Sequence, residues 1–354
     1  MTITPGWMGG ALPVECAASS KSVRLTRRAA ALLASAVLLL AALPACERKI
    51  GDSVERMVVV YTSADDVIAR PLLEKFEKQT GIKVLMKGDT EATKTTGLVE
   101  RLRAEKTSGR VRADVFWSSE PFLTCQLARE GVLAPAPPEV GKDWPRVGTD
   151  RKWFEFAERA RVSVARPGHE GDGKPIAIAR PQFGTTRGHM AALLTRDGEE
   201  KFRACLNAAK SAGVLQVDGN SAVVRAVAQG QASVGLTDTD DVWSAQAEGM
   251  RVEAHFENSG IFIALTVPNT AAMVAGSPHS TEAAALVDFL LSEESERFLM
   301  DSESHNIPVR AVLRAQFEQK YPGKLPKDAV RPDIERITDA MPRAIAIFEK
   351  VIGQ

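Results

Sequence analysis

The chain has 354 residues, and its 45 basic and 45 acidic side chains give a formal net charge of zero, which excludes a polybasic nucleic-acid-binding protein and an acidic disordered chain. Hydrophobic residues make up 44% and charged residues 25% of the sequence, as in a packed globular protein, and the length allows about two domains. Four cysteines in a chain of this length exclude a disulfide-stabilised scaffold.

The first segment, residues 1–45, has the features of an export signal. A basic patch precedes an apolar run at 29–43, which is shorter than the about 20 residues that a membrane-spanning helix needs. The small residue Ala45, followed by Cys46, resembles the lipobox of bacterial lipoproteins, in which the cysteine becomes the lipidated first residue of the mature chain. We therefore predict a lipoprotein-type signal peptide, lipidation of Cys46 and a polar tether at 46–56. A plain signal peptide with a nearby cysteine is the alternative.

The next segment alternates apolar runs with amphipathic helices. The run at 57–61 is continuously apolar, as in a strand buried on both faces, and the helix that follows it ends at Gly81. This alternation predicts a parallel α/β sheet. The other elements predicted here are strands at 82–86 and 113–117 and helices at 96–106 and 119–130.

A second α/β stretch is predicted from 176 to 254, after a surface excursion at 134–152 that is rich in Pro and Gly. The tail at 311–354 is predicted to be helical, with breaks at its prolines. Serine is expected to cap the helices at 280–291 and 292–300. The other predicted strands are 161–165, 232–236 and 261–267, and the other predicted helices are 186–195, 199–212 and 221–229.

Familiar catalytic and metal-binding signatures are absent from the sequence. The five histidines do not have the spacing of a helical zinc site, and there is no CxxC pair, GxSxG elbow or P-loop. We therefore predict a binding protein and no enzyme, although a site built on a single Ser or Asp would leave no such signature. Cys125 and Cys205 are expected to be free thiols on the apolar faces of helices.

Polar residues cluster at five predicted strand-to-helix turns. In an open parallel sheet such turns line the crevice beyond the carboxyl ends of the strands, and the unpaired N–H groups of each following helix favour anions. The alternative for any one turn is simple helix capping, because Ser, Thr and Asp are preferred caps. Five turns in two α/β stretches favour a ligand cleft between two lobes. The turns are 62–66, 118–120, 184–187, 219–221 and 237–241.

Several sequence runs also match a known family in the right order. They are VVVYTS at 58–63, FEKQTGIKV at 76–84, ADVFW at 113–117, FGTTRGH at 183–189, GNSAVVRAV at 219–227, GLTDTDD at 235–241, VPNT at 267–270 and PH at 278–279. Together they resemble the extracellular solute-binding proteins of ABC importers, and within these the ferric-iron-type group. The likeness covers about residues 57–310.

The resemblance implies an α/β fold of the two-lobed periplasmic-binding-protein type, with a ligand cleft between lobes that crossing strands join. Lobe one is expected at 57–165 plus 258–310, and lobe two at 166–257. The helical tail at 311–354 is expected to pack on the lobes.

The resemblance further implies a periplasmic receptor, attached to the membrane by its lipid, that captures a small polar solute and delivers it to the permease of an ABC importer. We expect a monomer with no nucleic-acid partner and no required cofactor. The cargo could be ferric iron or another metal ion with a synergistic anion. Alternatives are a polyamine held by carboxylates and Trp117, a phosphorylated organic solute, or an envelope enzyme that reuses the fold.

One departure from the family affects the expected site. Ferric-binding members hold iron with a Tyr-Tyr pair at the turn that reads Thr239-Asp240 here, and the chain's two tyrosines, Tyr61 and Tyr321, lie elsewhere. Carboxylates could instead give a cation hard oxygen ligands, while the turns at 185–187 and 220–221 match the region that holds the synergistic anion. The predicted ligand-binding residues are Ser63, Asp65, Ser119, Glu120, Thr185, Thr186, Arg187, Asn220, Ser221, Thr239 and Asp240, and the candidate metal ligands are Asp65, Glu120, Asp238 and Asp240.

Overall fold

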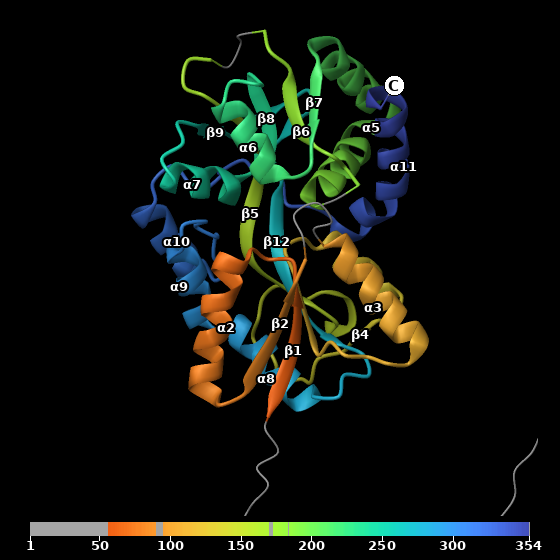
Figure 1. Ribbon diagram of the computed structural model, residues 1–354, viewed down its shortest axis with the longest axis vertical. Helices are drawn as coiled ribbons and strands as arrows, with labels where there is room; N and C mark the ends of the chain where they lie inside the picture. Colours follow the sequence, from red (N-terminus) through yellow and green to blue (C-terminus); the bar gives the residue numbers. More distant parts are fainter. Residues whose placement is uncertain (1–55, 90–94, 170–172, 183, 354) are drawn as a thin grey trace, which may run out of the picture. The chain divides into compact units, whose positions relative to one another are not determined.

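Figure 1 shows a computed structural model of the chain, which describes residues 56–89, 95–169, 173–182 and 184–353. The predicted signal peptide, the lipidation site Cys46 and the tether up to residue 55 lie outside these ranges. Among the described helices, none combines the length and the apolar character that a membrane span requires.

The first half of the main sheet confirms the predicted alternation of strands and helices. Strand β1 lies between β2 and β3 and is parallel to both. Val58 and Val60 of β1 are buried beneath α2, which Gly81 ends in the left-handed conformation (φ 67°). The elements are β1 (Met57–Thr62), α2 (Asp66–Thr80), β2 (Lys83–Gly88), α3 (Thr96–Ser108), β3 (Val115–Ser118), α4 (Phe122–Arg129) and β4 (Leu133–Ala134).

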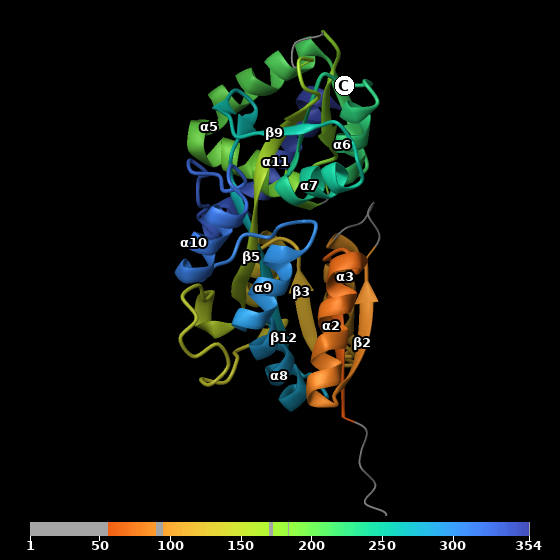
Figure 2. The same ribbon diagram turned by 90° about the vertical axis from the view of Figure 1, so that its left-hand side faces the viewer.

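Two long strands, β5 (Phe154–Ala165) and β12 (Thr266–Val274), join the halves of the sheet. Residues 154–160 of β5 pair with β12, whereas residues 161–165 pair with β8, so one strand runs from one half into the other (Figures 1 and 2). The strand order is β2-β1-β3-β12-β5-β8-β6-β7. Every residue of β5 is buried, so any charged side chain on it must find its partners inside the protein.

The second half repeats the parallel α/β pattern, with β6 between β7 and β8. The two helices predicted at 186–195 and 199–212 form one element, α5, which breaks at Gly198 (φ 78°). The short strands β7 and β9 were not predicted, whereas β11 lies inside the strand predicted at 261–267. The elements are β6 (Ile176–Ala179), α5 (Gly184–Ala212), β7 (Val214–Val217), α6 (Asn220–Ala228), β8 (Val234–Asp238), α7 (Thr239–Ala247), β9 (Glu253–His255), β10 (Asn258–Ser259) and β11 (Phe262–Ile263).

The last helix, α11, touches both halves. Asp339 accepts from Arg129 of α4 at 2.5 Å, and about one turn further along Arg343 pairs with Glu199 of α5 at 2.7 Å. Pro342 lies between these two contacts and inside the helix, so the predicted break there is wrong. The helices of this part are α8 (Ser280–Leu290), α9 (Glu293–Asp301), α10 (Ala311–Lys320) and α11 (Ile334–Ile352).

Three local predictions need correction. The excursion at 134–152, which includes a short 3-10 turn at Thr149–Arg151, covers the core instead of leaving it, because Trp144 is buried and its indole N–H donates to the Glu155 carbonyl at 2.7 Å. The strand predicted at 261–267 is divided in the structure: 262–263 form β11, and 266–267 are the start of the longer β12. Helix α8 begins at Ser280 with His279 as its N-cap, so the predicted cap Ser280 is wrong. The predicted cap Ser292 of α9 is confirmed.

Both described cysteines are free, as expected. Cys125 is buried in the core, where burial raises the pKa of its thiol, whereas Cys205 is only half-buried. Neither thiol lines the cleft described below.

Candidate ligand-binding cleft

A cleft of about 220 Å³ lies where the strands of both halves end and the next helices begin. The first half contributes the turns after β1 and β3, and the second half contributes the turns before α5, α6 and α7. This is the place that the strand-to-helix rule predicts for parallel sheets. The predicted residues that line it are Ser63, Asp65, Ser119, Thr185, Asn220, Ser221, Asp238 and Asp240.

The wall from the first half presents a fixed pair of hydroxyls. The Ser63 hydroxyl oxygen accepts from the Ser119 backbone N–H at 2.9 Å and lies 3.1 Å from the Ser119 hydroxyl. Thr95 also donates to Ser63, at 2.9 Å. Asp65 stands beside them at the start of α2, where its side chain makes no capping hydrogen bond. These contacts hold the two serines in place with polar atoms at the cleft.

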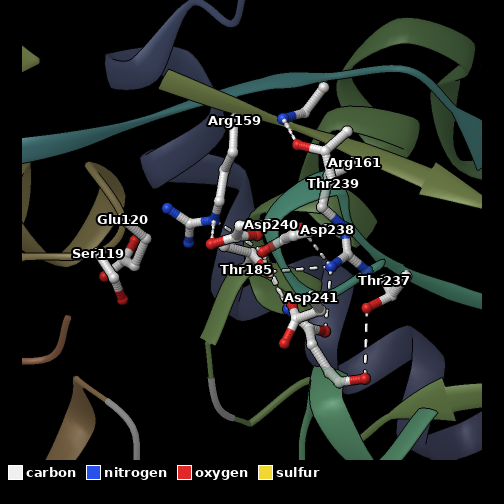
Figure 3. Close-up of polar contacts among 12 residues, drawn as sticks. Ser119, Glu120, Arg159, Arg161, Thr185, Thr237, Asp238, Thr239, Asp240 and Asp241 are labelled. Atoms are coloured by element: carbon white, nitrogen blue, oxygen red, sulfur yellow. Dashed lines mark hydrogen bonds and ion pairs between the residues drawn. The ribbon is translucent and has the colours of Figure 1, made fainter. Parts of the chain in front are cut away.

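The opposite wall is built around the buried carboxylate of Asp238, at the end of β8. Arg161 donates to Oδ1 at 2.7 Å, and Arg159 donates to Oδ2 at 3.0 Å. Oδ2 also accepts from the Thr185 hydroxyl at 2.7 Å and from the Asn220 amide at 2.9 Å. Figure 3 shows Arg159, Arg161 and Thr185 converging on Asp238 from β5 and the start of α5.

The charged groups of this network shift one another's pKa values. Burial alone would raise the pKa of Asp238, but Arg161 and Arg159 outweigh it and lower the pKa to about 2. The pKa of Arg159 is raised, because Asp240 and Asp238 outweigh the effect of its burial. Asp238 is therefore an anion held by two cations at any physiological pH.

Sequence reasoning missed the two arginines. Arg159 and Arg161 stand two residues apart on β5, so both point to the same face of the strand. Their sequence signal was two arginines at alternate positions in a run, 154–165, that also carries Glu155 and Glu158 among apolar residues. The strand had been predicted to begin only at Arg161, which hid that pairing.

Four predicted ligand-binding residues do not line the cleft. The Glu120 carboxylate accepts from the Phe122 backbone N–H at 2.8 Å at the start of α4, so it caps that helix. Burial raises the pKa of Glu120, against the attraction of Arg187. The others serve the fold: Thr186 accepts from Arg161 at 3.4 Å, Arg187 donates to Thr96 at 2.9 Å and Thr239 accepts from the Ala160 N–H at 3.1 Å.

The donor set fits a metal ion only in part. In the described chain one group of carboxylates could share an ion, namely Asp238, Asp240 and Asp241, with ligand atoms within 4.8 Å of one another. Asp65 and Glu120, two of the predicted metal ligands, do not belong to this group. Asp238 would have to give up part of its four hydrogen bonds to bind an ion, so the group offers fewer ligands than its residue count suggests.

The aromatic residues do not complete a metal or polyamine site. Tyr61 donates to Glu105 at 2.6 Å, and burial raises the pKa of Tyr61 to about 12; Tyr321 donates to Asp301 at 3.0 Å. Neither phenol lines the cleft. Trp117 does line it but is 1% exposed and packs against Phe156, so little of its ring is open to a cation.

Comparisons with known proteins agree with this architecture. The pattern of the family described as bacterial extracellular solute-binding protein matches residues 61–297. The major ferric iron-binding protein of Neisseria meningitidis serogroup B is 26% identical over 286 residues, which cover 74% of this chain and 82% of that protein.

Solved structures show the same fold. Iron-bound HitA from Pseudomonas aeruginosa is 20% identical, with a TM-score of 0.67 over 84% of this chain and 99% of HitA. The apo ferric ion-binding protein A from Pasteurella haemolytica is 18% identical, with a TM-score of 0.69 over 84% of this chain and 98% of that chain. The predicted resemblance and the predicted two-lobed α/β fold with crossing strands are therefore confirmed.

Proposed function

This chain belongs to the bacterial extracellular solute-binding proteins, and on that premise we propose that it captures a small polar solute in the cleft and delivers it to the permease of an ABC importer. The observation that carries the proposal is a single cleft whose polar walls come from both halves of a two-lobed fold. The extracellular role of the family implies a periplasmic location. We propose no catalytic step and no resident cofactor.

The proposed lobes are 57–165 plus 258–310 and 166–257, with β5 and the segment that enters β12 as their connections. A solute that touches Ser63 or Ser119 on one wall and Thr185 or Asn220 on the other would bind the closed arrangement better than an open one. Ligand binding would then shift the population toward closure, as expected of a hinged receptor.

A metal ion with a synergistic anion is the second candidate cargo. The carboxylates of Asp238, Asp240 and Asp241 favour it, as do relatives whose names describe them as ferric iron-binding. The lack of a tyrosine at the cleft weighs against ferric iron alone. A carried anion would supply oxygen ligands that the protein does not.

We expect a saturating solute to compact and stabilise the protein. A thermal-shift screen against metal ions, oxyanions and polyamines should yield a compound that, at 100 times its dissociation constant, adds about 2.7 kcal/mol to the free energy of unfolding. Small-angle scattering with that compound should give a smaller radius of gyration than without it. An unchanged radius with a confirmed tight ligand would contradict the hinged receptor.

We also propose that Cys46 carries the lipid that keeps the mature chain at the membrane. Cys46→Ala should block processing and leave an unmodified precursor, because the lipobox cysteine is both the modified and the new first residue. Intact-mass measurement of the membrane fraction checks this, with Cys125→Ala as a matched control that should be processed normally. A mature chain that begins at another residue would contradict the assignment.

A further inference from the structure

We infer that Arg159 anchors an oxyanion of the captured solute, a carboxylate or a phosphate group. The inference rests on the proposed function and narrows it, because it names the chemical class of the solute. The ligand-binding residues predicted from the sequence did not include Arg159. Three observations carry the inference: the free edge of its guanidinium, the fixed position of that edge, and the donors around it.

Within the described chain, only the Nε of the Arg159 guanidinium pairs with carboxylates of the protein. Its side chain is 5% exposed, and its Nε lies 3.0 Å from Asp238 and 3.4 Å from Asp240. No described residue accepts a hydrogen bond from its Nη1 or Nη2. Arg159 lines the cleft, and Figure 3 shows the Nη end directed away from Asp238 and toward the wall of Ser119. Two parallel N–H donors at the end of a guanidinium match the two oxygens of a carboxylate or phosphate.

This edge is held in position before any ligand arrives. Asp238 fixes Nε, and Asp238 is itself fixed by Arg161, Thr185 and Asn220 at 2.7–2.9 Å. A long arginine side chain that is already ordered loses little conformational entropy on binding, which favours affinity. Asp238 and Arg161 thus act as positioning residues for Arg159, and they do not need to touch the solute.

Other donors surround the same edge of the cleft. Ser63 and Ser119 present hydroxyls from the opposite wall, and the cleft also receives the first residues of α5 and α6. The N–H groups of a first helical turn attract anions, as does the partial positive charge of the helix end. The carboxylates of Asp65, Asp240 and Asp241 also line the cleft, so its charge does not exclude a cation. At the edge of Arg159 itself, the guanidinium fork and the helix starts favour an oxyanion.

The test is calorimetry of the purified protein with matched probes. Oxyanion probes are inorganic phosphate, glycerol 3-phosphate, succinate and citrate; the neutral probes are glycerol and succinamide; the cations are spermidine and ferric chloride, the last also supplied as ferric citrate. We expect binding by a phosphate or a carboxylate member and none by its neutral analogue. Comparison of the phosphate probes with the carboxylate probes then shows which of the two groups the solute carries.

Two variants test the residue itself. Arg159→Gln should weaken the oxyanion hit by at least about 30-fold, because a buried charge pair loses one partner. Since that variant could fold poorly, Arg159→Lys is the second: it keeps the charge opposite Asp238 but has no fork, and we expect at least about a tenfold loss. Arg251→Gln, an exposed arginine outside the cleft, is the matched control and should change affinity by less than about twofold.

The other outcomes separate this inference from the proposed function. Binding by spermidine, a neutral probe or ferric chloride alone would keep a solute receptor but overturn the oxyanion anchor, as would an oxyanion hit that survives both Arg159 variants. Binding by ferric citrate but not citrate, with loss in Asp240→Asn, would make the metal the primary ligand and also overturn it. No binding by any probe would overturn both.

Discussion

Replacing Asp238 with asparagine is expected to lower the free energy of unfolding by about 3–5 kcal/mol. The substitution keeps the size of the side chain but leaves the guanidinium groups of Arg159 and Arg161 buried without their carboxylate, and these side chains are 5% and 0% exposed. Urea unfolding at pH 7 measures the effect. The matched control is Asp218→Asn, which breaks the exposed pair with Arg180 and should change stability by at most about 1 kcal/mol.

The same prediction has a pH signature. The pKa of Asp238 is lowered to about 2 in the folded protein, against about 3.9 in the unfolded chain. A lowered carboxyl pKa adds stability that is complete above the unfolded value and is lost as the pH falls through the folded value. The difference between the native protein and Asp238→Asn should therefore be constant from pH 7 to about 4 and shrink between about pH 4 and 2. An equal difference at pH 7 and pH 2.5 would contradict the ion-pair explanation.

Phe348→Ala should destabilise the protein by about 3–5 kcal/mol, because it removes a large buried ring and leaves a cavity. Phe348 is 1% exposed and belongs to the core that α11 forms with α5, together with Phe202 and Leu206. Thermal and urea unfolding measure the loss. Lys350→Ala, on the exposed face of the same helix, should stay within about 0.5 kcal/mol. Similar losses in the two variants would show that α11 contributes little to the core.

The parts of the fold that were predicted correctly have local causes. The apolar run of β1 and the stop at Gly81 are visible in a few neighbouring residues, and the position of the cleft follows from strand order alone. The strand β7 was missed because it has only four residues, VLQV, and so short an apolar run shows no clear period. The segment 134–152 was placed on the surface because it is rich in Pro and Gly, although Trp144 within it is buried and Arg310, distant in the sequence, lies over its ring.

The sequence predicted where the candidate site lies, but not all of the side chains that form it. Ser63, Ser119, Thr185 and Asn220 line the cleft because their turns reach it. The sequence could not tell whether Glu120 caps a helix or binds a ligand, because both roles use the same residue type at the same turn; its carboxylate accepts from the Phe122 backbone N–H. Arg159 was missed because its partner Asp238 lies 79 residues further along the chain, and no local pattern records that contact.

The C-terminal helix could let residues outside the cleft influence the affinity for the solute. No residue of α11 lines the cleft, yet within about one turn of this helix Asp339 pairs with Arg129 of α4 and Arg343 pairs with Glu199 of α5. A closing movement that shifts α4 against α5 must strain or exchange one of these contacts, and Pro342 lies between them. If the proposed closure moves these helices in that way, the docking of α11 and the opening of the cleft are linked equilibria, and a substitution at Arg343 or Asp339 would change the apparent affinity for the solute by biasing which state the free protein populates.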